Sequence, residues 1–119
     1  MRDFRRLKVW ERAHNLTLAL YKATEHFPKE ESYGLKSQLR RSCSSIGANI
    51  SEGCGREGVN EFARFLIFAM GSASELENHL LLARDLHFLP DPIYQQLAAG
   101  VIEVKRMLTS LVQKLRADR

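Results

Sequence analysis

Apolar residues recur every three or four positions along most of the chain, with polar residues between them. The first such stripe comprises Leu7, Trp10, Ala13, Leu16/Thr17, Leu20/Tyr21 and Thr24. This spacing places side chains on one face of an α-helix and predicts an amphipathic helix from about Asp3 to Glu25. Phe27 and Pro28 end it, because proline disfavours helical geometry in the residue before it and has no N–H to donate.

The second stripe is built largely from small residues. Its apolar positions are Leu35, Leu39, Ser42/Cys43, Ile46 and Ile50, and most positions between them are Ser, Gly or Ala. Because Gly and Ser form helices poorly, neighbouring helices must hold this segment, and small side chains let their backbones approach closely. We expect a crowded central helix that begins near Glu31 or Ser32 and stops at Gly53-Cys54-Gly55, with Gly47 closely packed and Cys54 as a loop residue.

A polar stripe with the same spacing runs along this second helix and includes Gln38, Ser42, Ser45, Asn49 and Glu52. It either forms hydrogen bonds across a helix interface or is a solvated flank. Arg40 and Arg41 either join a basic surface or pair with carboxylates such as Glu75, and the polar neighbours favour pairing. The interface alternative predicts a buried polar network of Arg40, Arg41, Ser45, Asn49, Glu52 and Glu75.

The third stripe is the longest and most regular. It consists of Phe62, Leu66, Ala69, Ala73, Leu76, Leu80, Ala83 and Leu86/His87, a heptad pattern that predicts a helix starting after Gly58. A second apolar set on the same segment, which the heptad face cannot bury, comprises Phe65, Ile67, Phe68, Met70, Leu81 and Leu82. A helix that is apolar nearly all round needs cover on several sides, which favours a partner subunit. The candidate oligomer-interface residues are Phe65, Phe68 and Leu81.

A fourth helix completes the pattern. Pro90 interrupts the third helix, and Asp91 followed by Pro92 is typical of a new helix start. The apolar positions of this helix are Tyr94, Leu97, Val101, Val104, Leu108, Leu111 and Leu115. Four long helices with short connections predict an all-α, antiparallel up-down-up-down four-helix bundle, a single domain over residues 1–119. Both termini and the second loop would then share one end.

Basic residues concentrate near the two termini of a chain whose net charge is only +4. Clusters of this kind bind phosphate backbones without base-specific contacts. The alternative is that these residues offset a helix dipole and keep the protein soluble. The nucleic-acid-binding candidates, which we expect at the end that carries both termini, are Arg2, Arg5, Arg6, Lys8, Arg56, Lys105, Arg106, Lys114 and Arg116. We expect an acidic opposite end, with Glu25, Glu30, Glu31, Asp85 and Asp91.

Other functional classes receive little support. The sequence contains neither an apolar run long enough to span a membrane nor the apolar block of a signal peptide, so a cytoplasmic protein is expected. Cys43 and Cys54 are too few and too far apart for a zinc or redox motif, which predicts reduced thiols. The four histidines are scattered, and no phosphate-binding loop or serine elbow occurs. We therefore predict no catalytic residues, cofactor or metal.

The order of several motifs resembles a known family. They are LKVW at residues 7–10, FPKEESYGLKSQLRRS at 27–42, SIGANISEGCGR at 45–56, EFARFL at 61–66 and GSASELE at 71–77. This order resembles the bacterial four-helix-bundle family named for proteins encoded in intervening sequences of large-subunit ribosomal RNA genes. Gly58 departs from the pattern, since such sequences often have a Ser there that completes a helix-capping box. The resemblance covers nearly the whole chain.

The resemblance also implies an assembly and candidate partners. It implies a small basic bundle that forms a homopentamer. A similar fold occurs in the accessory protein of diversity-generating retroelements, which adds a reverse transcriptase as a candidate partner. Together these features predict a non-enzymatic homo-oligomer that binds nucleic acid, with RNA favoured, through its basic end. The alternative is a protein-interaction scaffold with no nucleic-acid role.

Overall fold

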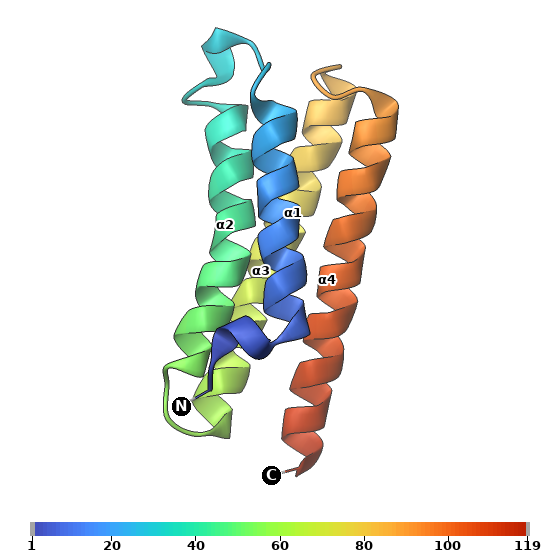
Figure 1. The fold of residues 1–119 in the computed structure, drawn as a ribbon. Helices are drawn as coiled ribbons and strands as arrows, with labels where there is room; N and C mark the ends of the chain where they lie inside the picture. The colour runs from blue at the N-terminus through green and yellow to red at the C-terminus, as the bar shows by residue number, and fades with distance from the viewer. Residues whose placement is uncertain (1, 119) are drawn as a thin grey trace.

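The computed structural model describes residues 2–118, which form four long α-helices and two short 3-10 turns. The helices are α1 (Lys8–Thr24), α2 (Leu35–Cys54), α3 (Val59–Asp85) and α4 (Asp91–Asp118), and the turns are η1 (Phe4–Arg6) and η2 (Lys29–Glu31). Consecutive helices run in opposite directions, and α4 packs back against α1, so that α1 lies diagonally across from α3 (Figure 1). This arrangement confirms the predicted all-α up-down-up-down bundle.

One hydrophobic core is shared by all four helices. Its fully buried large residues include Leu20 of α1, Leu39, Ile46 and Ile50 of α2, Phe62, Leu66, Leu76 and Leu80 of α3, and Val101, Val104 and Leu108 of α4. The predicted apolar faces of the last three helices therefore meet at the centre. In α1, however, Val9 is buried in place of its neighbour Trp10, which is half-buried, and Tyr21 is 41% exposed.

The start of α1 differs from the prediction. The Asp3 carboxylate accepts a hydrogen bond from the Arg5 backbone N–H at 3.1 Å and caps η1, Leu7 is extended, and α1 begins only at Lys8. The backbone N–H of Arg2 donates to the Cys54 carbonyl at 3.2 Å, so the N-terminal segment crosses to α2 (Figure 1). Because α1 is shorter than α4, the last turns of α4 lack full cover.

The consequence for α4 appears at its C-terminal end. Leu111 and Leu115 were both predicted in the core, but they are only half-buried, and Val112 takes the buried position between them. The remaining predicted core residues of α4, from Tyr94 to Leu108, are buried as expected.

The start of α2 also lies later than predicted, whereas its end falls within the predicted stop at Gly53-Cys54-Gly55. η2 occupies the region where the helix was expected to begin, and the Glu31 carboxylate accepts a hydrogen bond from the Leu35 N–H at 2.9 Å. This contact supplies a partner to one of the N–H groups that a helix start leaves unsatisfied, so α2 begins at Leu35. At the other end, Cys54 is the last helical residue and is buried, so its predicted loop position is wrong.

The close approach predicted for α2 occurs at a different glycine. A Cβ atom at Gly53 would lie 2.9 Å from Phe65 Cβ and 3.2 Å from Phe62 Cδ1, so the helix contacts α3 there through its backbone. At Gly47 the nearest atom would be Trp10 Nε1 at 3.5 Å, an ordinary contact. The buried face of α2 was predicted correctly, but the closest approach of its backbone to another helix lies at Gly53.

Candidate nucleic-acid interface

Both described ends of the chain and the α2–α3 loop lie at the same end of the bundle, as predicted (Figure 1). We call this the basic end and define it by Arg2, Arg5, Arg6, Lys8, Arg56, Lys114 and Arg116, which belong to its segments. Seven of the nine predicted nucleic-acid-binding residues are therefore brought to one end of the molecule.

Lys105 and Arg106 are not part of the basic end. They lie half-way along α4, because this helix continues to Asp118. Lys105 Nζ donates to Glu77 Oε1 of α3 at 2.9 Å, and both side chains are partly buried. Lys105 therefore links two helices. Arg106 is exposed on the side of the bundle.

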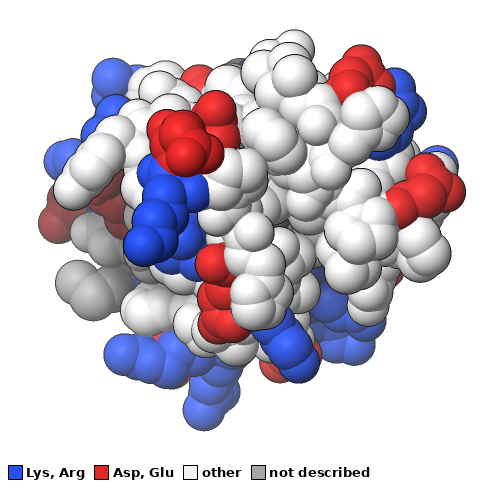
Figure 2. All heavy atoms as spheres, turned by 90° about the horizontal axis from the view of Figure 1, so that it is seen from above, with Lys and Arg blue, Asp and Glu red and all other residues white. Residues whose placement is uncertain are grey.

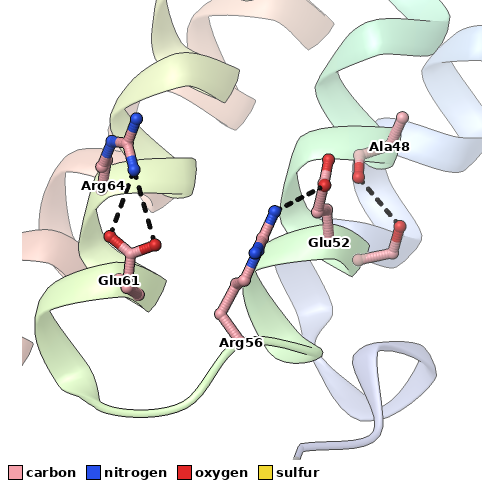
Figure 3. A network of polar contacts seen from close by, with 6 residues as sticks. Ala48, Glu52, Arg56, Glu61 and Arg64 are labelled. Atoms are coloured by element: carbon pink, nitrogen blue, oxygen red, sulfur yellow. Dashed lines mark hydrogen bonds and ion pairs between the residues drawn. The ribbon is translucent and has the colours of Figure 1, made fainter.

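Two cations of the basic end have a carboxylate partner. Arg5 pairs with Asp3 at 3.2 Å, and Arg56 pairs with Glu52 at 3.2 Å. Figure 3 shows the Arg56–Glu52 pair on one side of the α2–α3 loop. A similar ion pair within α3, between Arg64 and Glu61, lies on the other side. Within residues 2–118, the cations of the basic end without an ion pair are Arg2, Arg6, Lys8, Lys114 and Arg116.

Three arginines of this end lie over aromatic rings. The guanidinium carbons of Arg2, Arg5 and Arg56 lie 4.3, 4.5 and 5.0 Å from the ring centroids of Phe62, Phe4 and Phe65, respectively. Such cation–π contacts restrict the long side chains while leaving the edges of the guanidinium groups available for hydrogen bonds. These arginines are thus held in place before any ligand binds.

The opposite end carries both signs of charge. Its predicted acidic residues are accompanied by basic ones, namely Lys22, Lys29, Lys36 and Arg84, and Arg84 pairs with Asp85 at 3.0 Å. Figure 2, which views this end, shows blue and red groups around a largely uncharged centre. The prediction of an acidic end is therefore too strong, and the contrast between the ends comes from the cations of the basic end.

The predicted buried polar network divides into separate contacts. Ser45 Oγ and Ser72 Oγ lie 2.9 Å apart across the α2–α3 interface, and Asn49 Nδ2 donates to the Ser45 carbonyl at 2.9 Å. This part agrees with the interface alternative. Arg40 instead turns towards α1, where its Nε donates to Thr24 Oγ1 at 2.9 Å and its Nη2 donates to the Tyr21 carbonyl at 3.0 Å.

The other predicted members of that network lie at the surface. Glu75 is exposed and contacts His79 at 3.8 Å, so the expected pairing of Arg40 with Glu75 is wrong. Glu52 is exposed beside Arg56, and Arg41 is exposed.

The candidate interface residues of α3 differ in accessibility. Phe65 is only 8% exposed, because it packs against Gly53 within the same chain, so its assignment to an intersubunit surface is not supported. Phe68 is 43% exposed, and Leu81 is exposed as well. The outer face of α3 also presents Ile67, Leu82 and Leu86, and we call these five exposed residues the apolar face of α3.

A set of aromatic residues between α1 and α2 was missed as a candidate site. The rings of Trp10 and His14 stack with centroids 4.8 Å apart and planes 13° apart, and Phe4 meets Trp10 edge-on at 5.0 Å. They border a cavity of about 260 Å³ whose α2 side is formed by Ser44, Gly47, Ala48 and Ser51. The four-residue spacing of Trp10 and His14 was the available signal, but Trp10 was assigned to the core.

Both cysteines are buried thiols. Burial raises the pKa of Cys43 to about 11, although a hydrogen bond with Thr17 acts in the opposite direction. Burial also raises the pKa of Cys54, while the nearby Arg2 lowers it. A raised pKa suppresses the reactive thiolate. Among residues 2–118 no three His, Cys, Asp or Glu side chains are grouped to hold a metal ion.

These features define a class, a small four-helix bundle with a cationic end and an exposed apolar helix face. The model of the 23S rRNA-intervening sequence protein family matches residues 5–110, and the chain therefore belongs to this family. None of the helices within residues 2–118 is long and apolar enough to cross a membrane.

The fold is also found in a solved structure. The chain is similar to a protein of unknown function from the S23 ribosomal protein family of Bacteroides thetaiotaomicron, with 23% sequence identity and a TM-score of 0.79. The match covers 87% of this chain and 97% of the other. No match is found among curated proteins.

Proposed function

We propose that the protein is a non-enzymatic, cytoplasmic homo-oligomer that binds nucleic acid, RNA in particular, through its basic end. The observation that carries this proposal is the group of cations at one end that lack an ion pair within residues 2–118, especially Arg6, Lys114 and Arg116. They are exposed, so a phosphate group reaches them without displacing a carboxylate.

Phosphate binding by such a surface is driven by counterion release. Each neutralised phosphate frees condensed cations, so affinity falls steeply as salt concentration rises and depends little on sequence. The chemistry needs neither a bound metal nor a base-specific pocket. It fits a basic end built from flexible Lys and Arg side chains beside arginines already placed over aromatic rings.

The apolar face of α3 supports self-association. Large apolar side chains exposed together along one helix of a small protein are typical of a protein contact. The resemblance implies a pentamer, and in a cyclic oligomer whose symmetry axis runs along the bundles the basic ends of all subunits gather on one side. A ring would thereby multiply the number of phosphates contacted at once. A reverse transcriptase partner stays a prediction of the resemblance.

The test compares matched charge removals at the two ends. Arg6, Lys114 and Arg116 are changed together to Gln, and the control changes Lys22, Lys29 and Lys36 to Gln, which alters net charge equally. We expect the first set to weaken RNA binding and to reduce the slope of log affinity against log salt by up to about 2, since each contact to a single strand contributes roughly 0.7. The control should bind as the unmodified protein does.

The readout is fluorescence polarisation of labelled RNA from low to near-physiological salt, with circular dichroism to verify folding. Equal losses from the two variants would contradict binding through the basic end. A complete lack of RNA and DNA binding at low salt would contradict nucleic-acid binding altogether and favour the protein-interaction scaffold.

A further inference from the structure

We propose that the groove between α1 and α2 binds unpaired nucleotides by base stacking, which makes single-stranded nucleic acid the ligand class of this protein. The inference rests on the proposed function and deepens it. The basic end would hold phosphates, and the groove would distinguish a single strand from a duplex.

The part of the groove next to η1 is the cavity described above, where flat aromatic rings lie beside small residues. Trp10 and His14 stack at 4.8 Å with nearly parallel planes, and Phe4 closes one side of the same cavity. On the α2 side, a Cβ atom at Gly47 would lie 3.5 Å from Trp10 Nε1, so the edge of Trp10 is in ordinary contact with α2, and the exposed Ala48 adds little bulk beside the cavity. At about 260 Å³ the cavity is small, and it suits a single planar ring system better than a larger ligand.

These aromatic residues lie at the margin of the hydrophobic core. Val9 and Ala13 supply the buried face of α1, whereas Trp10 is half-buried and His14 is exposed. The Trp10 ring packs partly against the core, whereas the His14 ring is exposed beside the cavity. Stacking a base against these rings would bury more of their area, and every base has a π-face that can do so.

A second aromatic surface lies farther along α1 and α2, outside this cavity. The Arg40 guanidinium of α2 lies over the Tyr21 ring of α1 at 4.4 Å from its centroid. Hydrogen bonds to Thr24 Oγ1 and to the Tyr21 carbonyl fix the guanidinium in this position. Unstacked bases in RNA complexes stack on aromatic rings and on Arg planes alike. Tyr21 lies about 16 Å from Trp10 along the helix, a span for a few nucleotides.

The groove begins at the basic end. Phe4 belongs to η1 together with Arg5 and Arg6, Arg2 precedes this turn, and the Arg5 guanidinium carbon lies 4.5 Å from the Phe4 ring centroid. A strand whose phosphates contact these arginines would have its bases next to Trp10 and His14. A duplex keeps its bases stacked internally, so it would contact the cations but leave the groove empty.

The polar groups in the groove indicate tolerance of sequence. Ser44 Oγ and Ser51 Oγ donate to the carbonyls of Arg41 and Ala48 in their own helix at 3.2 and 2.9 Å. Their hydroxyl donors are therefore already used, and they offer only acceptor lone pairs to a base. Stacking would supply most of the contact, with little discrimination among bases.

The experiment uses Trp10, the single tryptophan of the chain, as a reporter. The full-length protein is titrated at one low salt concentration with oligouridylate or with a duplex RNA, and tryptophan fluorescence and polarisation of labelled RNA are followed together. We expect oligouridylate to quench Trp10 in step with binding, and the duplex to bind without quenching.

Variants test the stacking surfaces directly. Tyr21→Leu and His14→Ala change exposed side chains, and each should weaken oligouridylate binding by about five-fold or more while leaving duplex binding unchanged. Tyr21→Phe keeps the ring and should retain affinity. Tyr33→Leu removes an aromatic residue that is 97% exposed outside the groove and should have no effect.

Three results would overturn the inference. Oligouridylate binding without Trp10 quenching would show that bases do not enter the groove, and equal quenching by the duplex would remove the preference for single strands. Unchanged affinity of both Tyr21→Leu and His14→Ala would show that their rings take no part. Each of these outcomes leaves binding through the basic end intact, whereas a lack of binding by either RNA removes the proposed function as well.

Discussion

At the residue scale, the small side chains of α2 have different neighbours and different energetic roles. We expect Gly53→Ala to destabilise the fold by about 1 to 3 kcal/mol, because the added methyl group would overlap Phe65 Cβ at 2.9 Å and approach the Phe62 ring at 3.2 Å. Urea unfolding followed by circular dichroism measures the change.

Gly71 provides the matched control, because it is also helical but a Cβ there meets nothing within 4 Å. Gly71→Ala should raise the free energy of unfolding by up to about 1 kcal/mol through helix propensity alone. If Gly53→Ala were as stable as Gly71→Ala, the close contact between α2 and α3 would not exist.

Cys43 makes the stability of the protein depend on alkaline pH. Its pKa is about 11 in the folded chain, against an ordinary value of 9.0, so the folded state retains the thiol proton more tightly than the unfolded state does. This contribution is fully present below pH 9 and is lost as pH rises through about 11. We expect a loss of roughly 2 kcal/mol by pH 11, since one pKa unit corresponds to about 1.4 kcal/mol.

The check is a series of urea unfolding curves between pH 8 and pH 11. Other groups titrate in the same range, so the comparison is with Cys43→Ala, which should be less stable at pH 8 but should lose less stability on going to pH 11. Parallel pH curves for the two proteins would contradict the assignment.

Which residues face the core could be predicted, but not which neighbour each would meet. The three- and four-residue spacing correctly placed Leu39, Ile46 and Ile50 inside. The same spacing does not indicate which residues of another helix lie opposite. It therefore predicts close packing at Gly47, whereas the closest contact lies at Gly53. Arg40 illustrates the same limit, because its partner Thr24 lies on α1.

For the helices, the periodicity of apolar residues correctly predicted that four helices exist and alternate in direction. It did not predict the residues at which α1 and α2 begin. Asp3 and Glu31 each use a carboxylate to bond a backbone N–H a few residues later, at Arg5 and Leu35. Such local side-chain contacts compete with the helix and shift its first residue. Periodicity does not register them, since they involve polar residues outside the apolar stripe.

The outer face of α3 provides the prediction at this scale. Phe68→Glu and Leu81→Glu should convert the proposed oligomer to monomers without unfolding them, because both side chains are exposed within the single chain. Phe65→Glu should instead destabilise the fold, since it removes a buried ring that packs against Gly53 of α2. Light scattering coupled to size exclusion measures the mass, and circular dichroism the helix content.

Leu18→Glu serves as the control, because Leu18 is an exposed apolar residue on α1, diagonally across the bundle from α3. It should leave the oligomer intact. A monodisperse monomer of the unmodified protein at micromolar concentration would contradict self-association, and dissociation by Leu18→Glu would place the contact on a different face.

At the level of the whole molecule, the predicted topology correctly places the two described ends of the chain at one end of the bundle. The prediction that Lys105 and Arg106 also lie there was wrong, because it relied only on their closeness to the C-terminus in the sequence. The bundle is 47 Å long, and Lys105 lies 13 residues before the end of α4, about 20 Å away from it. Screening at physiological salt acts over about 8 Å. Charges at mid-helix and at the basic end are therefore nearly independent, so only the local surplus at the end matters for a phosphate ligand.

Self-association through the apolar face of α3 should strengthen RNA binding by the basic end. If cyclic packing through the apolar face of α3 gathers the basic ends, a neutral variant that dissociates the oligomer, Phe68→Gln with Leu81→Gln, should lower both RNA affinity and the salt slope although every cation is retained. The physical reason is that one subunit offers few unpaired cations within a Debye length, whereas adjacent subunits add theirs to the same strand.

Polarisation titrations of a long labelled RNA over a range of salt concentrations, with the mass of the free protein measured in parallel, provide the check. Leu18→Gln should match the unmodified protein in mass, affinity and slope. A monomeric variant that keeps the full salt slope would mean that a single basic end holds the whole phosphate contact. Assembly would then serve a purpose other than nucleic-acid binding.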